Sequence, residues 1–230
     1  MAKNKKISRK QLLKEPDEFL TFSSKVLNYA AANKKPIIAA ACGIFILLAV
    51  IAAVQYSSFR SENRASGLLS DAWSRYEAAL SETDPTEAYK EVEEDFRGLL
   101  KTYGTTEAGK MGRAMFAHIA YEAGEPEQAV RLYEAALPTF QNDPALRNLI
   151  LSGLGYACEQ RKEYAKAVDY FQRIVSGDSP VLKSEAYFNL GRIYTLLENP
   201  RKSREAYETI LSDYSDSIYA DMVKERLAAG

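Results

Sequence analysis

The clearest hydropathy pattern in the chain is an apolar run from Ile37 to Val54, which contains no charged residue and no amide side chain. At about 1.5 Å of rise per helical residue, this run makes a helix of roughly 27 Å, close to the thickness of about 30 Å of a bilayer hydrocarbon core. Two lysines precede the run and Tyr56 follows it, and such residues often flank membrane spans. The pattern predicts a transmembrane helix over residues 36–56.

Two other interpretations of the apolar run remain open. A cleaved signal peptide has a short basic head and a small-residue cleavage site, whereas 35 residues precede Pro36 and the exit "AVQYSS" shows no A-x-A pattern. The stretch "AAAC" ending at Cys42 resembles a lipoprotein cleavage site, but the apolar run continues past it. A soluble core helix of this length usually keeps a polar face. A retained membrane anchor is therefore preferred over both alternatives.

A short segment before the span, with apolar residues at helical spacing, indicates a second membrane-associated element. In the stretch "PDEFLTFSSKVLNYAAAN", one face of a helix would carry Phe19, Phe22, Val26, Tyr29 and Ala30. An amphipathic helix with such a face lies well in a membrane interface. Residues 1–35 are therefore predicted to form a basic cytoplasmic head with a juxtamembrane amphipathic helix.

After the span, the hydrophobic pattern repeats. Three similar segments begin at Phe116, Leu154 and Leu190, at offsets of 38 and 36 residues. Each predicts a helix, a short polar turn and a second helix. The second helix has a small residue and then an aromatic residue four positions later, in the pairs Ala129 and Tyr133, Ala167 and Phe171, and Ser203 and Tyr207. A repeat of this length made of two helices predicts a solenoid of stacked helix pairs.

Small residues in the first helix of each unit suggest how the helices pack. Glycine inside a helix costs roughly 1 kcal/mol, so Gly155 and Gly191 require a packing reason, which is close contact between helices. The aromatic residues of the second helices are expected to fill the gap to the next pair. Gly124 and Pro200 stand where the chain must turn between helices.

These segments resemble the tetratricopeptide repeat, whose pattern is W-x₂-L-G-x₂-Y…A-x₃-F…P. The opening of that pattern is matched nearly whole by Tyr187, Leu190, Gly191 and Tyr194. The first unit is degenerate, because Phe116-Ala117 stands in place of Leu-Gly.

The repeats are extended at both ends. A weaker unit precedes them, with Leu69, Trp73 and Tyr76 on its first helix and a second helix that starts at Asp84-Pro85. The C-terminal segment "DSIYADMVKERLAA" alternates apolar and charged residues, as a solubilising capping helix does. The predicted fold class is all-α: a single transmembrane helix followed by a tetratricopeptide-like helix-pair solenoid with a C-terminal capping helix.

The distribution of charge indicates topology and narrows the class of partner. Nine Lys and Arg residues precede the span, whereas the 35 residues after Gln55 hold four, so the N-terminus is predicted to be cytoplasmic and residues 57–230 to be exported. Residues 1–35 have net charge +6 and the rest has net charge −7. The acidic domain argues against nucleic acid as a ligand. The basic head suits an anionic lipid bilayer surface, either for topology control alone or for specific lipid recognition.

Residues that could carry catalysis are few. His118 is the only histidine. Cys42 lies in the predicted span and Cys158 in the predicted exported domain, so the two cysteines cannot form a disulfide bond with each other. No zinc site and no catalytic nucleophile set can be assembled from these three residues. Cys158 lies on an apolar helix face and is interpreted as a small core residue. No phosphate-binding glycine motif is present. The chain is therefore predicted to be non-enzymatic and to need no cofactor.

The first helices of the repeats are predicted to line the concave face of the solenoid. Residues on them that point away from their own pair form the predicted protein-binding groove: Met111, Ala114, His118, Tyr121, Leu149, Ser152, Tyr156, Phe188, Arg192 and Thr195. His118, Tyr156 and Arg192 occupy equivalent positions and are expected to form a row. Aromatic and Arg residues suit a partner helix or a partly folded chain. The alternative is that Tyr156 and Phe188 only pack against the neighbouring repeat.

The order of these parts resembles the bacterial YfgM-type family, the ancillary subunit of the Sec translocon. That resemblance implies a bacterial inner-membrane protein, single-pass, with its C-terminal domain in the periplasm. It implies association with the Sec translocon and with a membrane-anchored prolyl-isomerase-like chaperone. It also implies that exported client proteins are passed to periplasmic chaperones. An envelope-assembly scaffold that binds a different inner-membrane or cell-wall complex is the alternative function.

Overall fold

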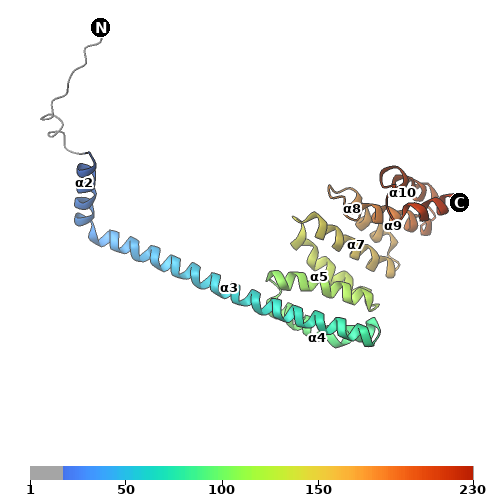
Figure 1. Ribbon diagram of the computed structural model, residues 1–230, viewed down its shortest axis with the longest axis horizontal. Helices are drawn as coiled ribbons and strands as arrows, with labels where there is room; N and C mark the ends of the chain where they lie inside the picture. Colours follow the sequence, from blue (N-terminus) through green and yellow to red (C-terminus); the bar gives the residue numbers. More distant parts are fainter. Residues whose placement is uncertain (1–17, 230) are drawn as a thin grey trace, which may run out of the picture. The chain divides into compact units, whose positions relative to one another are not determined.

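The computed structural model describes residues 18–229, and every regular element in this range is a helix (Figure 1). The elements are α2 (Glu18–Ala32), α3 (Lys34–Glu82), α4 (Pro85–Tyr103), α5 (Glu107–Glu122), α6 (Pro126–Ala136), the 3-10 helix η1 (Leu137–Phe140), α7 (Pro144–Gln160), α8 (Tyr164–Val175), α9 (Lys183–Leu196), α10 (Pro200–Asp213) and α11 (Ala220–Ala229). The all-α prediction is confirmed. Most of the predicted basic head falls on residues 1–17, which lie outside the described residues.

The chain divides into an N-terminal unit that ends at Ser57 and a C-terminal unit that begins at Ser58. In the first unit, α2 forms where the amphipathic helix was predicted, and its apolar side chains at Phe22, Val26 and Tyr29 are exposed. An apolar face left open in this way is the property expected of a helix that lies in a membrane interface.

Helix α3 contains the predicted span. Its most apolar window of 18 residues has a mean hydropathy of 3.0, and none of that window is buried. Phe45, in the middle of the run, is 74% exposed. By length and composition α3 fits a single-pass membrane anchor. The helix is continuous through Gln55 and ends only at Glu82, so the first helix of the weak N-terminal repeat belongs to the same element as the span.

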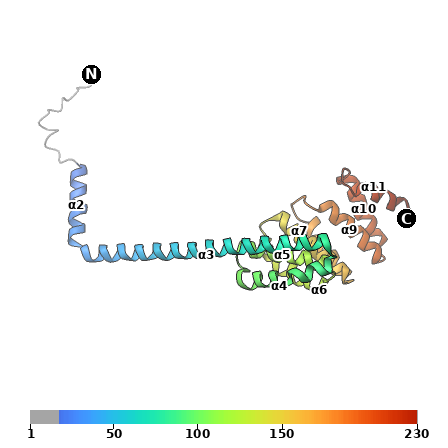
Figure 2. The same cartoon turned by 60° about the horizontal axis from the view of Figure 1, so that its bottom comes forward.

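The C-terminal unit is built from antiparallel helix pairs that follow one another along the chain (Figures 1 and 2). The last part of α3 packs against α4, where Arg75 forms an ion pair with Asp95 at 2.7 Å. The next pairs are α5 with α6, α7 with α8 and α9 with α10. Phe96, Phe116, Leu154 and Phe171 are among its fully buried side chains. The unit therefore has the helix-pair solenoid that the sequence repeats predict.

Local sequence sets the helix boundaries. Asp84 and Asp143 cap α4 and α7 through their carboxylates, Asn199 caps α10 through its side-chain oxygen, and proline follows each cap at the first helical position. At the turn inside each of the last three pairs, one residue takes a left-handed conformation. These residues are Gly124, Lys162 and Glu198, so the predicted turns at Gly124 and Pro200 are confirmed.

Close packing explains the helical glycines. A Cβ atom added to Gly155 would overlap the Phe171 ring, and one added to Gly191 would overlap the Tyr207 ring. Both rings lie on the glycine of their own pair. Tyr133 instead lies on Gly153 of the next pair, and so it is Tyr133 that fills a gap between pairs in the way expected of these aromatic residues.

The last helix covers the end of the solenoid. In α11, Val223 is fully buried against Tyr207 and Ile210 of α10, while Met222 is 41% exposed. One apolar side and one solvated side are what a capping helix requires, and this part of the predicted fold is confirmed.

Candidate protein-binding groove

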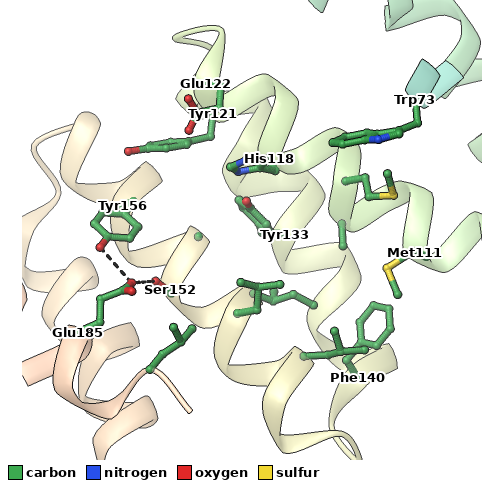
Figure 3. Close-up of a pocket in the computed structure, with 17 residues that line it drawn as sticks. Trp73, Met111, His118, Tyr121, Glu122, Tyr133, Phe140, Ser152, Tyr156 and Glu185 are labelled. Carbon is green, nitrogen blue, oxygen red and sulfur yellow. Dashed lines mark hydrogen bonds between the residues drawn. The ribbon is translucent and has the colours of Figure 1, made fainter. Parts of the chain in front are cut away.

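A cavity of about 530 Å³ opens between the α5–α6 pair and the α7–α8 pair (Figure 3). We call it the α5–α7 groove, and its lining consists of Trp73, Met111, Ala114, Met115, His118, Tyr121, Glu122, Tyr133, Phe140, Leu146, Leu149, Ile150, Ser152, Gly153, Tyr156, Leu182 and Glu185. The volume lies within the range of about 300 to 1,000 Å³ that is usual for ligand sites. All of these residues belong to the C-terminal unit.

Most of the groove wall is apolar. Met111 and Met115 of α5 and Leu149 of α7 are among the lining residues. Trp73 of α3 lies at one side of the groove (Figure 3). Leu149 is 58% exposed, so it does not contribute much to the core. Methionine side chains are flexible and polarizable, which lets a binding wall adapt to different apolar partners.

The opposite side of the groove is polar and centres on Glu185 of α9 (Figure 3). The Glu185 Oε1 atom accepts hydrogen bonds from Ser152 Oγ at 2.9 Å and from the Tyr156 hydroxyl at 3.0 Å. The Tyr219 hydroxyl donates to Oε2 at 3.5 Å. Within residues 18–229, no Lys, Arg or His forms an ion pair with Glu185 or with Glu122.

Aromatic rings run along the groove. The centroids of His118 and Tyr121 are 6.5 Å apart, and those of Tyr121 and Tyr156 are 6.2 Å apart. Burial, followed by Glu122, raises the pKa of Tyr121, and burial raises the pKa of Tyr133 and Tyr156 strongly. These hydroxyl groups are therefore neutral at physiological pH and offer hydrogen bonds rather than charge.

Seven of the ten predicted groove residues line this cavity: Met111, Ala114, His118, Tyr121, Leu149, Ser152 and Tyr156. The three predicted residues of α9, which are Phe188, Arg192 and Thr195, do not. The structure thus gathers the residues from the first two repeats and separates those of the third.

Each of the three separated residues contacts other parts of the fold. Arg192 forms a two-pronged ion pair with Glu159, with Nη2 to Oε2 at 2.6 Å, and Nη2 also donates to the Asn189 side chain. Phe188 stacks on Tyr219 with centroids 4.8 Å apart. Thr195 donates to the Gly191 carbonyl oxygen at 3.1 Å. Phe188 therefore packs within the fold, against Tyr219 beyond the last repeat and Tyr207 of its own pair rather than against a neighbouring repeat.

The expected row is continuous only through intermediates. His118 reaches Tyr156 through Tyr121, and the Tyr156 hydroxyl accepts from Asn189 Nδ2 at 2.8 Å. Asn189 then accepts from Arg192. The row therefore changes along its length from aromatic contacts to a polar network.

Sequence reasoning missed Glu185, although a signal for it existed. With the offsets of 38 and 36 residues, Glu185 is equivalent to Leu149 and Met111, both of which were predicted. Continuing that row into the third repeat would have found it. Trp73, Tyr133 and Phe140 carry no such signal, because they reach the groove from elements outside the first helices of the three repeats.

Cys158 is fully buried, as the interpretation of a core residue requires. Burial raises the pKa of its thiol to about 11, which suppresses the reactive thiolate at neutral pH. Among the described residues, no group of His, Cys, Asp and Glu could hold a metal ion.

In this chain, helix pairs stack, and a small residue of one helix packs against an aromatic residue of its neighbour. These features place the protein in the class of helical-repeat proteins. The tetratricopeptide repeat family matches residues 114–181 and again residues 184–212. This chain therefore contains tetratricopeptide repeats, and such repeats generally bind protein partners. The weak N-terminal pair of α3 and α4 lies outside the matched residues. No curated protein matches the chain.

Proposed function

We propose that this protein is a non-enzymatic, membrane-anchored scaffold that binds a polypeptide segment in the α5–α7 groove. The observation that carries the proposal is the apolar cavity of about 530 Å³ with an exposed leucine and two methionines in its wall. Exposed apolar side chains around a concave site favour the capture of apolar partner residues.

The cellular setting follows from the anchor and from the resemblance. The single apolar segment of α3 and the preceding basic residues support a bacterial inner-membrane protein with a cytoplasmic N-terminus and a periplasmic repeat domain. In that setting the protein associates with the Sec translocon and with a membrane-anchored prolyl-isomerase-like chaperone, and it passes exported client proteins to periplasmic chaperones. The open groove suits clients that have emerged but have not yet folded.

The proposal is tested by co-purification of the tagged full-length protein from detergent extracts. Leu149→Gln places an amide in the apolar wall of the groove. The fold is expected to be retained, because the position is exposed. Capture of translocon subunits is expected to fall about fivefold or more, which corresponds to the loss of about 1 kcal/mol of binding free energy. Leu196→Gln is the matched control, because Leu196 is 52% exposed and lies outside the groove. Translocon subunits are expected with the parent and with the control.

Two results would count against the proposal. Equal recovery of translocon subunits with Leu149→Gln would exclude the groove as their binding site. Recovery of cell-wall or outer-membrane assembly subunits in place of translocon subunits would favour the envelope-assembly function.

Topology is tested separately. A reporter that is active only in the periplasm, fused after Gly230, is expected to be active, and the purified protein is expected to retain its N-terminal residues. A mature chain that begins near Gln55 would show a cleaved signal and overturn the anchor.

A further inference from the structure

We propose that Glu185 binds the cationic group of a Lys or Arg side chain, so that the polypeptide held in the α5–α7 groove carries a basic residue beside its apolar ones. This inference rests on the proposed function, since it specifies the chemistry of the segment that the groove holds.

The position of Glu185 is the first observation. It is the equivalent of Met111 and Leu149 in the third repeat, where a carboxylate replaces two apolar side chains that line the same groove. Apolar contacts are therefore available in the middle of the groove, and a negative charge is available at its α9 side (Figure 3).

The surroundings of Glu185 are the second observation. Ser152 and Tyr156 donate hydrogen bonds to one of its oxygen atoms, and these fix the carboxylate in place. Hydroxyl groups orient the charge without neutralising it. Glu159, two turns further along α7 than Ser152, shows the opposite arrangement, because Arg192 compensates its charge within the fold. Of these two carboxylates at the boundary of α7 and α9, only Glu185 is left without a cation in the described part of the chain.

The charge of the whole lining is the third observation. The groove contains two carboxylates, Glu122 and Glu185, and neither Lys nor Arg is among its lining residues. An acidic segment would be repelled there, whereas a Lys or Arg side chain can place its methylene groups against the apolar wall and its charge beside Glu185. Charge complementarity therefore selects a segment that is both apolar and basic.

A purely structural role for Glu185 makes a different prediction. If its only task were to join α7 to α9, Gln would serve almost as well, because the amide oxygen accepts the same hydroxyl hydrogen bonds. Glu185→Gln thus removes the charge while it keeps the shape and the acceptor. A change in ligand preference without a change in folding would separate the two roles.

The experiment measures peptide binding to the full-length protein in lipid nanodiscs by fluorescence anisotropy, with empty nanodiscs as the background. The probes are two labelled amphipathic peptides of about 15 residues, identical except that one carries Lys where the other carries norleucine. We expect the Lys peptide to bind about tenfold more tightly, a difference of about 1.4 kcal/mol. In Glu185→Gln the preference is expected to fall below about twofold, while the norleucine peptide keeps its affinity.

Glu134→Gln is the matched control. Glu134 also accepts a tyrosine hydroxyl, from Tyr170 at 3.2 Å, but it lies outside the groove, so the preference is expected to stay near tenfold. Equal affinity of the two peptides for the parent would overturn the role of Glu185 and leave the groove intact. Failure of both peptides to bind above the empty-nanodisc background would overturn the groove itself and with it the preference.

Discussion

Two junctions of the solenoid are built on the same repeat and differ in what fills them. The first junction, between the α5–α6 and α7–α8 pairs, contains an apolar cavity, and within the described residues no side-chain hydrogen bond joins α5 to α7. Polar contacts across this junction join other elements, as where the Tyr170 hydroxyl of α8 donates to Glu134 of α6 at 3.2 Å. The second junction, between the α7–α8 and α9–α10 pairs, is closed by hydrogen bonds from Ser152 and Tyr156 to Glu185 and by the ion pair of Arg192 with Glu159.

The difference shows that the repeat pattern determines the arrangement of the backbone. A few side chains then determine whether a junction is open to a partner or closed by polar contacts. At the first junction the equivalent positions are mainly apolar or aromatic and remain available to a partner. At the second junction polar side chains of α7 and α9 bond to one another, while Glu185 keeps its charge without a cation in the described part of the chain. Hydrogen bonds and ion pairs between side chains help to fix the register of neighbouring elements, and this is the role we assign to the second junction.

The largest expected effect distinguishes two glycines on α7. Gly155→Ala is expected to lower the free energy of unfolding by about 2 kcal/mol, because the added Cβ would lie 2.5 Å from the fully buried Phe171 ring. Gly153→Ala is expected to cost about 1 kcal/mol or less, because the Tyr133 ring that it displaces borders the cavity. Urea unfolding of the full-length protein in detergent measures both.

Gly98→Ala is the control for helix propensity. A Cβ atom there has no neighbour within 4 Å, so the substitution is expected to stabilise the protein by roughly 0.5 to 1 kcal/mol. If Gly153→Ala costs as much as Gly155→Ala, the first junction is as tightly packed as the rest and the comparison fails.

The next effect concerns the ion pair of the second junction. Glu159→Gln leaves the Arg192 charge without its partner. The Glu159 side chain is 18% exposed and that of Arg192 is 29% exposed. We therefore expect the free energy of unfolding to fall by about 1 kcal/mol, rather than by the roughly 3 to 5 kcal/mol lost when a fully buried pair is broken. The double variant Glu159→Gln with Arg192→Met is expected to be less destabilised than the two single changes added together. Strict additivity in this double-mutant cycle would mean that the pair does not hold the junction.

Most of the fold could be predicted from the sequence, because its signals are local. The run from Ile37 to Val54 and the small residues at Gly155 and Gly191 reflect the periodicity and close approach of helices. The length of α3 could not be predicted, since the absence of a breaker near Gln55 does not by itself set where a helix ends.

The groove could be predicted only in part, because the partner of each polar side chain is not local. Arg192 occupies the same repeat position as His118 and Tyr156, yet Glu159 of the preceding repeat pairs with it. Phe188 lies beneath Tyr219, which precedes the capping helix. Such contacts depend on which side chains meet across a junction, and a single repeat does not contain that information.

A third effect depends on pH and compares Tyr133, which lines the cavity of the first junction, with Tyr156, which lines it too and also donates to Glu185 at the second junction. Burial raises the pKa of both hydroxyls above the ordinary value of about 10. The folded state keeps these protons when the unfolded state has lost them, so the stability that they contribute is complete below pH 10 and is lost progressively as the pH rises above 10. Each Phe variant is expected to reduce the slope of that loss by up to about 1.4 kcal/mol per pH unit.

At pH 7 the two tyrosine variants are expected to differ. Tyr156→Phe loses hydrogen bonds to Glu185 and Asn189 and costs about 1 kcal/mol, whereas no hydrogen bond of the Tyr133 hydroxyl is found among the described residues. Equal costs at pH 7, measured by urea unfolding, would contradict the contrast between a paired and an open junction.

The smallest effect concerns Ser152, which belongs to both junctions because it lines the cavity and donates to Glu185. Ser152→Ala removes one hydrogen bond to the Glu185 carboxylate, which still accepts a hydrogen bond from the Tyr156 hydroxyl. Because alanine also has a higher helix propensity than serine, the free energy of unfolding is expected to fall by only about 0.5 kcal/mol. The charge of Glu185 remains, and the preference for the Lys peptide is therefore expected to stay within about twofold of the parent, unlike that of Glu185→Gln. Loss of the preference in Ser152→Ala would mean that the hydroxyl network at the second junction controls binding at the first, and the two junctions would then act as one site.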